Sequence, residues 1–350
     1  MDSVFPSSHL TTHVIPLQYK SHHNTLKCIS VSEIGKELRD HDNLKQDMPT
    51  ENPSERFADI DRWSTQSAVE AMFEAQLSAI AAIGHELATI AQAAEAASRH
   101  LMENGRLIYA GAGTSGRIAV QDGVELCPTF GWPTERVAYA MAGGNPALIS
   151  SVELAEDDAE AAVRDLNAIA LNKNDVVIGV AASGRTTYTV SAIKTANANG
   201  ALTIGISNNR PSPLLEIARI GICAETGSEA IAGSTRMKAG TAQKAILNMF
   251  STATMICCGR IYKGQMVDMV ISNQKLRNRA VAMIARLADV EKSVAESALN
   301  SAEGNIKVGV LCAEGLDVDA AKQLLNRNHG ILRDAVDDMN QGSAIRRDWT

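Results

Sequence analysis

Apolar residues recur at three- and four-residue spacing between Ser64 and Met102, which predicts one or two long amphipathic helices. Short apolar runs follow and alternate with stretches of helical period. The runs span Arg106–Ala110, Val137–Met141, Asp175–Val180, Leu202–Ile206 and Ile220–Ala224. Continuous apolar strands that alternate with helices are typical of a parallel sheet covered on both faces. We therefore predict an α/β fold built on a doubly wound, five-stranded parallel sheet.

Helical period also fills the stretches between the strands and the end of the chain. The predicted helices lie around 116–126, 146–169, 187–199 and 212–218, with one long helix over Ser234–Gly259. From about 275 onward the pattern is helical, and only Lys307–Leu311 resembles a strand.

The predicted organisation has three parts. Residues 1–49 form a poorly ordered extension, because their apolar periodicity is weak. Residues 50–280 form the sheet domain with its leading N-terminal helices. Residues 281–350 form a small helical C-terminal domain.

Composition excludes several classes of protein. With 45% hydrophobic and 21% charged residues, the chain has the balance of a soluble globular protein. Aromatic residues, at 4%, are too few for the stacking platforms that bind single-stranded nucleic acid. The net charge of -7 argues against bulk attraction to nucleic acid or to an anionic membrane. No uncharged apolar run approaches the roughly 20 residues of a spanning helix, so we expect a cytoplasmic protein.

The available side chains narrow the chemistry. The six cysteines show no metal-ligand or redox spacing, so we expect reduced thiols and no metal site. Five of the eight histidines lie in the first 50 residues, which leaves His85, His100 and His329 in the body of the chain. A Ser-His-Asp or Cys-His mechanism is therefore nearly excluded, and acid–base work falls to carboxylates.

Two loops have the composition of phosphate-binding turns. Gly111–Arg117 follows the first predicted strand, and Ala181–Thr187 follows the third. Glycine lets the backbone approach a ligand, hydroxyls donate hydrogen bonds, and the dipole of the next helix favours an anion. The first loop also fits a dinucleotide fingerprint, but the hydroxyls between its glycines favour a phosphate monoester. Plain strand-to-helix turns would explain one such loop better than two.

A third segment, Gly233–Lys244, places basic residues where a helix begins. Ser234 is the predicted N-cap, and Arg236 and Lys238 fall in the first turn, where the helix dipole disfavours cations. This placement indicates an anionic partner, and pairing with a surface carboxylate is the alternative.

Two glutamates are the candidates for acid–base chemistry. Glu125 lies among apolar neighbours just before Pro128, and burial there would raise its pKa toward the range of a general acid. Glu156 lies with Glu153 and Asp157 on a predicted helix surface. A cluster of carboxylates raises one member's pKa when it is partly buried, but usually it is a solvated face. The residues alone do not separate Glu156 from Glu153.

At these segments the chain resembles bacterial N-acetylmuramic acid 6-phosphate etherases, which belong to the sugar isomerase (SIS) superfamily. The resemblance rests on 108–117, 181–186 and 233–244 and runs from Thr50-Glu-Asn-Pro to the C-terminus, over about 300 residues. The family's catalytic glutamates lie in segments like Ala-Ser-Glu-Cys-Pro-Pro-Thr and Glu-Gly-Ala-Glu-Asp, which match Glu125 and Glu156. This chain departs from the two patterns at Gly123, Val124, Leu126 and Leu154.

The resemblance implies a lyase-type etherase of cell-wall recycling that cleaves the D-lactyl ether of N-acetylmuramic acid 6-phosphate without a metal or redox cofactor. It implies Glu125 as main acid/base and Glu156 as the second proton-transfer residue. The implied substrate and phosphate ligands are Thr114, Ser115, Ser183, Thr186 and Lys238. SIS domains typically pair, so the resemblance also implies a homodimer with an amino-sugar phosphate as its small-molecule partner.

Two other functions remain open at this stage. A phosphosugar isomerase would use the same fold, the same loops and the same removal of a C2 proton. A non-catalytic, sugar-phosphate-sensing regulator is the other possibility, because the glucokinase regulatory protein resembles the same family. That protein carries two SIS domains, and this chain has room for one.

Overall fold

The computed structural model describes residues 48–347, and of residues 342–347 the backbone alone. The predicted poorly ordered extension over 1–49 therefore lies almost entirely outside the described residues. Two short 3₁₀ helices, η1 (Glu55–Phe57) and η2 (Ile60–Arg62), precede the first long helices. The prediction of one or two long helices between Ser64 and Met102 is confirmed. They are listed here with the 3₁₀ turn between them: α2 (Thr65–Ala81), η3 (Ala82–Glu86) and α3 (Leu87–Met102).

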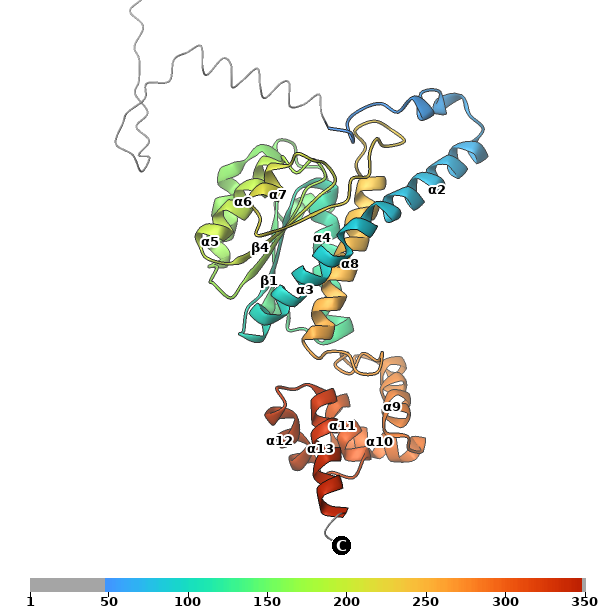
Figure 1. The fold of residues 1–350 in the computed structure, drawn as a ribbon, viewed down its shortest axis with the longest axis vertical. Coiled ribbons are helices and arrows are strands. Elements are labelled where there is room, and N and C mark those ends of the chain that lie inside the picture. The colour runs from blue at the N-terminus through green and yellow to red at the C-terminus, as the bar shows by residue number, and fades with distance from the viewer. Residues whose placement is uncertain (1–47, 348–350) are drawn as a thin grey trace, which may run out of the picture. The chain divides into compact units, whose positions relative to one another are not determined.

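Five parallel strands form a single sheet in the order β2-β1-β3-β4-β5 (Figure 1). The strands are β1 (Leu107–Gly111), β2 (Val137–Met141), β3 (Val176–Val180), β4 (Leu202–Ser207) and β5 (Ile220–Cys223). Each predicted strand is confirmed to within one residue at either end. After β1 the chain adds β2 on one side of it and then β3 on the other, so the strand order switches direction between β1 and β3. In α/β proteins, ligands bind in the crevice at the carboxyl ends of the strands on either side of such a switch.

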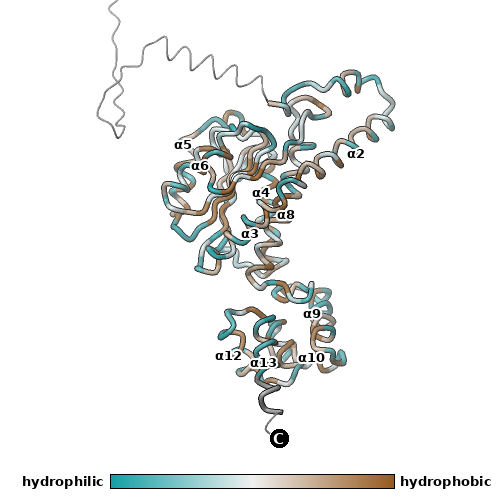
Figure 2. Tube along the Cα trace, viewed as in Figure 1, coloured by the Kyte–Doolittle hydropathy of each residue, from teal (hydrophilic) through white to brown (hydrophobic). Residues whose placement is uncertain are grey.

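Helices cover both faces of the sheet, as the predicted doubly wound fold requires (Figure 1). One layer consists of α3, α4 (Gly113–Phe130) and α8 (Lys238–Cys257), and the other of α5 (Ala159–Ile169), α6 (Thr187–Ala198) and α7 (Pro213–Ile217). Successive strand residues alternate between the layers: Tyr109 belongs to the first core and Ile108 to the second. Apolar residues, brown in Figure 2, run along the buried strands because both faces of the sheet are covered.

Two helix predictions on either side of the sheet are wrong at their starts. The stretch 146–169 is helical mainly from Ala159 onward, where the Asp158 side chain accepts a hydrogen bond from Ala161 N and caps α5. Before it, the chain forms turns and two short 3₁₀ helices, η5 (Asn145–Leu148) and η6 (Ala155–Asp157). The predicted helix over Ser234–Gly259 begins only at Lys238, so Ser234 is not its N-cap.

The C-terminal part of the described chain is helical and has its own apolar core. Its helices are α9 (Gln274–Ala288), α10 (Lys292–Ser301), α11 (Ile306–Ala313), α12 (Val318–Arg327) and α13 (Leu332–Arg347). Ile284, Leu299 and Leu325 lie in this C-terminal core, which also includes Tyr262 ahead of α9. The domain boundary between residues 280 and 281 stays a prediction.

The predicted strand over Lys307–Leu311 is wrong, because these residues belong to α11. The Asn305 side chain accepts a hydrogen bond from Val308 N at 3.0 Å and starts the helix. Residues 306–311 are buried all round the helix. A fully buried helix has no polar face, so its sequence cannot be told from a buried strand by period alone.

Helix α2 is apolar on two sides. Its buried residues are Ala71, Ala75 and Ala79, on the side that packs near α8. A second set of apolar side chains, which we call the apolar stripe, is 47–61% exposed at helical spacing: Val69, Phe73, Leu77 and Ile80. By length and composition alone, the helical stretch Thr65–Met102 could cross a membrane, although it contains glutamates such as Glu86 and Glu95. Core helices of soluble proteins share this length and composition.

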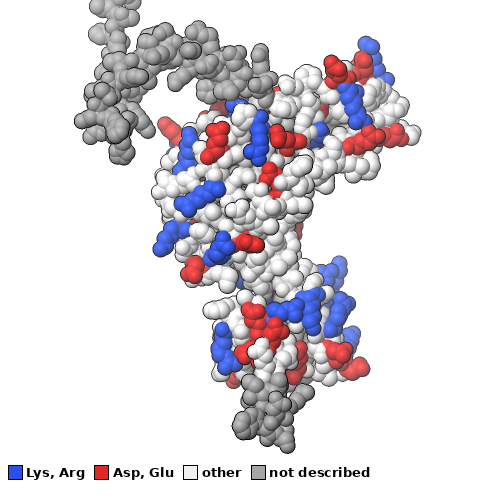
Figure 3. Space-filling view, viewed as in Figure 1, with Lys and Arg blue, Asp and Glu red and all other residues white. Residues whose placement is uncertain are grey.

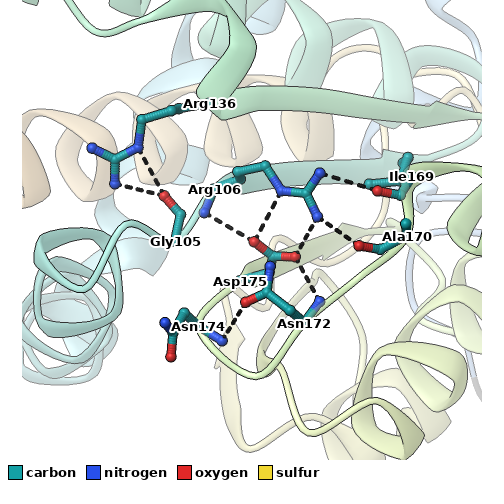
Figure 4. A network of polar contacts seen from close by, with 8 residues as sticks. All are labelled: Gly105, Arg106, Arg136, Ile169, Ala170, Asn172, Asn174 and Asp175. Atoms are coloured by element: carbon teal, nitrogen blue, oxygen red, sulfur yellow. Dashed lines mark hydrogen bonds and ion pairs between the residues drawn. The ribbon is translucent and has the colours of Figure 1, made fainter.

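A buried ion pair locks β1 to β3 at their amino ends (Figure 4). Asp175 is fully buried, and its carboxylate accepts hydrogen bonds from Arg106 N, Nε and Nη2 at 3.1, 3.1 and 2.6 Å and from Asn172 N at 2.9 Å. Arg106 also donates to the carbonyls of Ile169 and Ala170. Burial alone would raise the pKa of Asp175, but these donors outweigh it and hold the pKa below 3.8.

Candidate active site

The two predicted phosphate loops follow neighbouring strands, since the end of β1 pairs with the end of β3 at Gly111 and Val180. Helix α4 follows the first loop and α6 the second, and neither N-cap residue, Ala112 or Thr186, bonds the helix with its side chain. By contrast, Asp158, Ser212 and other N-cap side chains close the helices they precede. The free backbone N–H groups at the starts of α4 and α6 suit an anion.

The first loop packs tightly against the sheet. Gly113 has φ of +52°, a backbone conformation that glycine adopts without strain. A Cβ on Gly116 would lie 2.4 Å from Met141 Sδ and 2.8 Å from the carbonyl carbon of Gly111. The glycines therefore bring the start of α4 against the end of β1. Thr114 and Ser115, half-buried, lie between them.

The second loop packs against the end of β4 and the turn that follows it. Ser183 Oγ accepts a hydrogen bond from Arg185 N at 3.1 Å, and Gly184 has φ of +66°. A Cβ at Gly184 would lie 1.9 Å from Ser212 Oγ and 2.6 Å from Ser207 Oγ. No side chain other than hydrogen fits there, so the glycine is required by the serines that support the loop.

A cavity of about 270 Å³ opens beside the first loop and contains Glu156. Its lining includes Thr114, Arg117, Glu153 and Glu156. Arg117 donates to the carbonyls of Ala147 at 2.8 Å and Ser150 at 2.9 Å, which ties α4 to the segment that carries both glutamates. The structure thus brings Thr114 and Glu156 together at one cavity.

The acidic cluster has a different backbone from the predicted one. Glu153, Glu156 and Asp157 were expected on a helix surface, but they lie on a turn and the 3₁₀ helix η6. Glu153 and Glu156 are both exposed and line the same cavity, so the geometry does not separate them. Leu154 between them has φ of +60°, a strained conformation for a leucine.

Glu125 lies elsewhere on the surface of the chain. Its predicted burial is wrong for the single chain, because the side chain is exposed on α4 next to an exposed Val124. It lies twelve residues beyond Gly113, which is about 18 Å along the helix axis. One chain therefore does not bring Glu125 to the cavity of Glu156.

The start of α8 is closed by a buried carboxylate. Glu229 is fully buried and accepts hydrogen bonds from Lys238 N and Ala239 N, both at 2.9 Å. Lys238 Nζ donates to the Ser228 carbonyl at 3.1 Å, and burial lowers its pKa despite the nearby Glu229. Glu229 therefore bonds the backbone of α8, while the Lys238 ammonium bonds a carbonyl, so the predicted pairing of the basic side chains with a surface carboxylate is not found among residues 48–347. The role of Lys238 toward a ligand stays a prediction.

Comparison with known proteins assigns the family. Residues 153–253 match the SIS domain, and residues 89–197 match the N-terminal SIS domain of glucokinase regulatory protein. An N-acetylmuramic acid 6-phosphate etherase of Halalkalibacterium halodurans is 44% identical over 84% of this chain and 99% of its own length. This chain belongs to the N-acetylmuramic acid 6-phosphate etherase family. Another member, from Vibrio atlanticus, is 42% identical over 80% of this chain and 92% of its own.

Among solved structures, a phosphoheptose isomerase from Francisella tularensis aligns with 56% of this chain and 98% of its own, with a TM-score of 0.43 and 20% identity.

Two of the departures from the etherase family patterns lie at positions with a special local geometry. Where the pattern has alanine, this chain has Gly123, and a Cβ there would lie 2.7 Å from Tyr139 and 2.8 Å from Tyr109. The two tyrosine rings stack with centroids 6.1 Å apart. Where the etherase pattern has glycine, Leu154 keeps the positive φ that glycine adopts freely.

Several residues that shape the site were missed from the sequence. Asp122, buried one turn before Glu125, accepts hydrogen bonds from Tyr109 at 2.9 Å and Ser251 at 3.1 Å. Burial raises the pKa of Asp122, and these donors only partly offset it. Glu229 was missed because its partners lie nine and ten residues away across a loop. In the sequence, Glu229 is the only charged residue between 226 and 235, and this was the one signal that could have singled it out.

Proposed function

We propose that this chain is an N-acetylmuramic acid 6-phosphate etherase that releases D-lactate and leaves N-acetylglucosamine 6-phosphate. The observation that carries the proposal is the 44% identity along 99% of an etherase of that name. The site supports it chemically: two uncapped helix starts beside hydroxyl-bearing loops suit a phosphate monoester. Exposed carboxylates, Glu153 and Glu156, line the cavity beside the start of α4.

The protein's catalytic groups need only transfer protons in this reaction. With the sugar ring open, the C2 proton lies next to an aldehyde, and a carboxylate removes it. The electron pair forms a C2–C3 double bond as the C3–O bond breaks, and the departing lactate oxygen takes a proton from a carboxylic acid. Water then adds, its hydroxyl to C3 and its proton to C2. General acid–base catalysis of this kind asks for carboxyl groups and for no metal or redox cofactor.

We assign roles to the predicted residues accordingly. Thr114, Ser115, Ser183 and Thr186 hold the phosphate with the free N–H groups of α4 and α6. Glu156 transfers a proton or activates water at the cavity. The exposed Glu125, in the middle of α4, is the main acid/base.

A homodimer reconciles the positions of the two glutamates. Glu125 and Glu156 act on one sugar, yet the helix axis separates Glu125 from Gly113 by about 18 Å. We therefore infer that the site is completed by a second copy, whose Glu125 reaches the cavity of the first. Exposed apolar residues flank both places, Val124 beside Glu125 and Ile149 and Leu154 near Glu156. Covering them with a partner would remove water from the carboxyl groups.

The dimer surface also includes the apolar stripe of α2. Figure 3 shows a largely uncharged area over the middle of α2, α3 and α8. Exposed Leu87 and Ile256 extend the apolar surface on α3 and α8. Several exposed apolar side chains on one uncharged face are typical of an interaction site.

Mixed dimers test the shared site. Glu125→Gln and Glu156→Gln chains, each inactive alone, are expected to regain about a quarter of wild-type activity when refolded together at equal amounts. Random mixing makes about half the dimers mixed, and each mixed dimer has one intact site if the glutamates come from different copies. The activity of the mixture is measured as lactate release.

A matched control keeps that result interpretable. Adding Phe73→Glu to both chains places a charge in the apolar stripe, so the mixture should stay monomeric by light scattering and stay inactive. Mixed dimers that form without regained activity would show that each site takes both glutamates from one chain.

The activity itself is tested by product analysis on the purified chain. Incubation with N-acetylmuramic acid 6-phosphate should release D-lactate in equal amount to N-acetylglucosamine 6-phosphate. Interconversion of a ketose and an aldose phosphate without lactate release would favour a phosphosugar isomerase instead. Binding without turnover of any sugar phosphate would favour the regulator. The cytoplasmic location and the lack of a nucleic-acid or membrane partner stay predictions.

A further inference from the structure

Thr50 lies at the start of the described chain and belongs to the Thr50-Glu-Asn-Pro segment, to which the proposed chemistry assigns no role. It is fully buried. Its backbone N–H donates to Asn209 Oδ1 at 3.4 Å, and Asn209 Nδ2 donates to Thr50 Oγ1 at 2.9 Å. Its carbonyl accepts from Gly233 N at 3.1 Å. Thr50 therefore joins the loop after β4 to the loop before α8.

The side-chain amide of Asn209 also forms a hydrogen bond with the second phosphate loop. Its Nδ2 also donates to the Ala182 carbonyl at 2.8 Å. The same carbonyl accepts from Asn208 N at 3.0 Å and from Ser207 Oγ at 3.3 Å. Three donors on one carbonyl oxygen, which has two lone pairs, fix the orientation of the peptide between Ala182 and Ser183.

That orientation decides where the N–H of Ser183 points. In a trans peptide the N–H and the preceding C=O point in opposite directions in one plane. Because the Ala182 carbonyl faces the β4 loop, the Ser183 N–H faces away from it. Ser183 N makes no hydrogen bond with any residue in the described range 48–347. It is left as a donor beside the uncapped start of α6.

We propose that Thr50 is a positioning residue that sets the affinity of the site for the phosphate group. The Thr50–Asn209 pair, which we call the clasp, holds the Ala182 carbonyl so that Ser183 N–H, Ser183 Oγ and the start of α6 converge on one anion. This rests on the proposed function only for the identity of the substrate. Binding of inorganic phosphate does not depend on it.

The clasp acts on the phosphate group and not on the reacting carbons. Removing the Thr50 hydroxyl leaves one N–H of a buried amide without its acceptor, so the amide turns and its bond to Ala182 weakens. The phosphate is bound alike in ground and transition states, and a loss of such uniform binding raises KM with little change in kcat. The clasp therefore favours phosphorylated over unphosphorylated sugars.

The test compares Thr50→Val with three other chains by titration calorimetry. For Thr50→Val, the Kd of inorganic phosphate and of N-acetylglucosamine 6-phosphate should rise about tenfold, the effect of one charge-assisted hydrogen bond. Thr50→Ser keeps the hydroxyl and should restore both values. Thr254→Val is the matched control, since its buried hydroxyl donates to the Phe250 carbonyl within α8. Binding of unphosphorylated N-acetylglucosamine should be the same in all four.

Each outcome decides the inference. An unchanged phosphate Kd in Thr50→Val, or equal weakening of phosphorylated and unphosphorylated sugar, overturns it, and so does the same loss in Thr254→Val. If Thr50→Val does not fold, Thr50→Ala, which puts no extra methyl against Asn209, carries the same comparison. Loss of phosphate affinity in a chain whose wild type releases no lactate would support the clasp while refuting the etherase.

Discussion

Glu125→Gln is expected to lower kcat for lactate release by about 10²–10⁴-fold while leaving substrate binding and folding intact. Glutamine keeps the shape of the side chain but neither accepts nor donates the proton that moves between C2 and the carboxyl group. Glu125 is exposed in the single chain, so the substitution removes no internal packing. Exchange of the C2 hydrogen with deuterated solvent should stop together with lactate release. Both are followed by proton NMR.

Two other variants sharpen this result. Glu156→Gln should also be slow, but it should keep some C2 exchange if Glu156 serves ring opening or water addition. Glu160→Gln changes an exposed glutamate on α5 and should behave like the wild type. A folded Glu125→Gln protein that releases lactate at near the wild-type rate would refute the assignment and the mechanism built on it.

Asp175→Asn is expected to lower the free energy of unfolding by about 3–5 kcal/mol, the usual cost of breaking a buried ion pair from one side. The asparagine leaves the Arg106 guanidinium, which is only about a quarter exposed, without its counter-charge between β1 and β3. Urea denaturation followed by circular dichroism measures the loss. Asp59→Asn removes an exposed partner of Arg62 and should change stability by less than about 1 kcal/mol.

The same carboxylate makes stability depend on acid. The pKa of Asp175 is lower in the folded protein than its ordinary value of 3.8. Its contribution is therefore complete above the unfolded pKa, near pH 4, and is lost as the pH falls through the folded pKa. Wild-type stability should fall steeply below pH 4, and Asp175→Asn should show a flatter acid dependence. Parallel curves for the two proteins would show that Asp175 does not titrate on unfolding.

The sequence by itself determined the layered fold and the two loops. Strand runs such as Leu202–Ile206 and the helical period before Met102 are local signals, because a continuous apolar run or a 3.6-residue repeat lies in residues close together in the chain. Gly113 and Gly184 are local signals too, since a positive φ favours glycine. Family membership also lay in the sequence, in motifs long enough to be specific.

Only the tertiary structure decided what depends on partners far along the chain. Residues 306–311 are buried all round, so their pattern matches a buried strand as well as a helix, and the Asn305 cap on Val308 N starts a helix there. The start of α8 is closed by Glu229 rather than by Ser234, since the chain before the helix folds back and the Glu229 carboxylate accepts from the first N–H groups, nine and ten residues ahead. Thr50 meets Asn209 across 159 positions. Glu125 is exposed although Leu126 beside it is buried, because burial is decided by what packs on a helix face and not by adjacent residues.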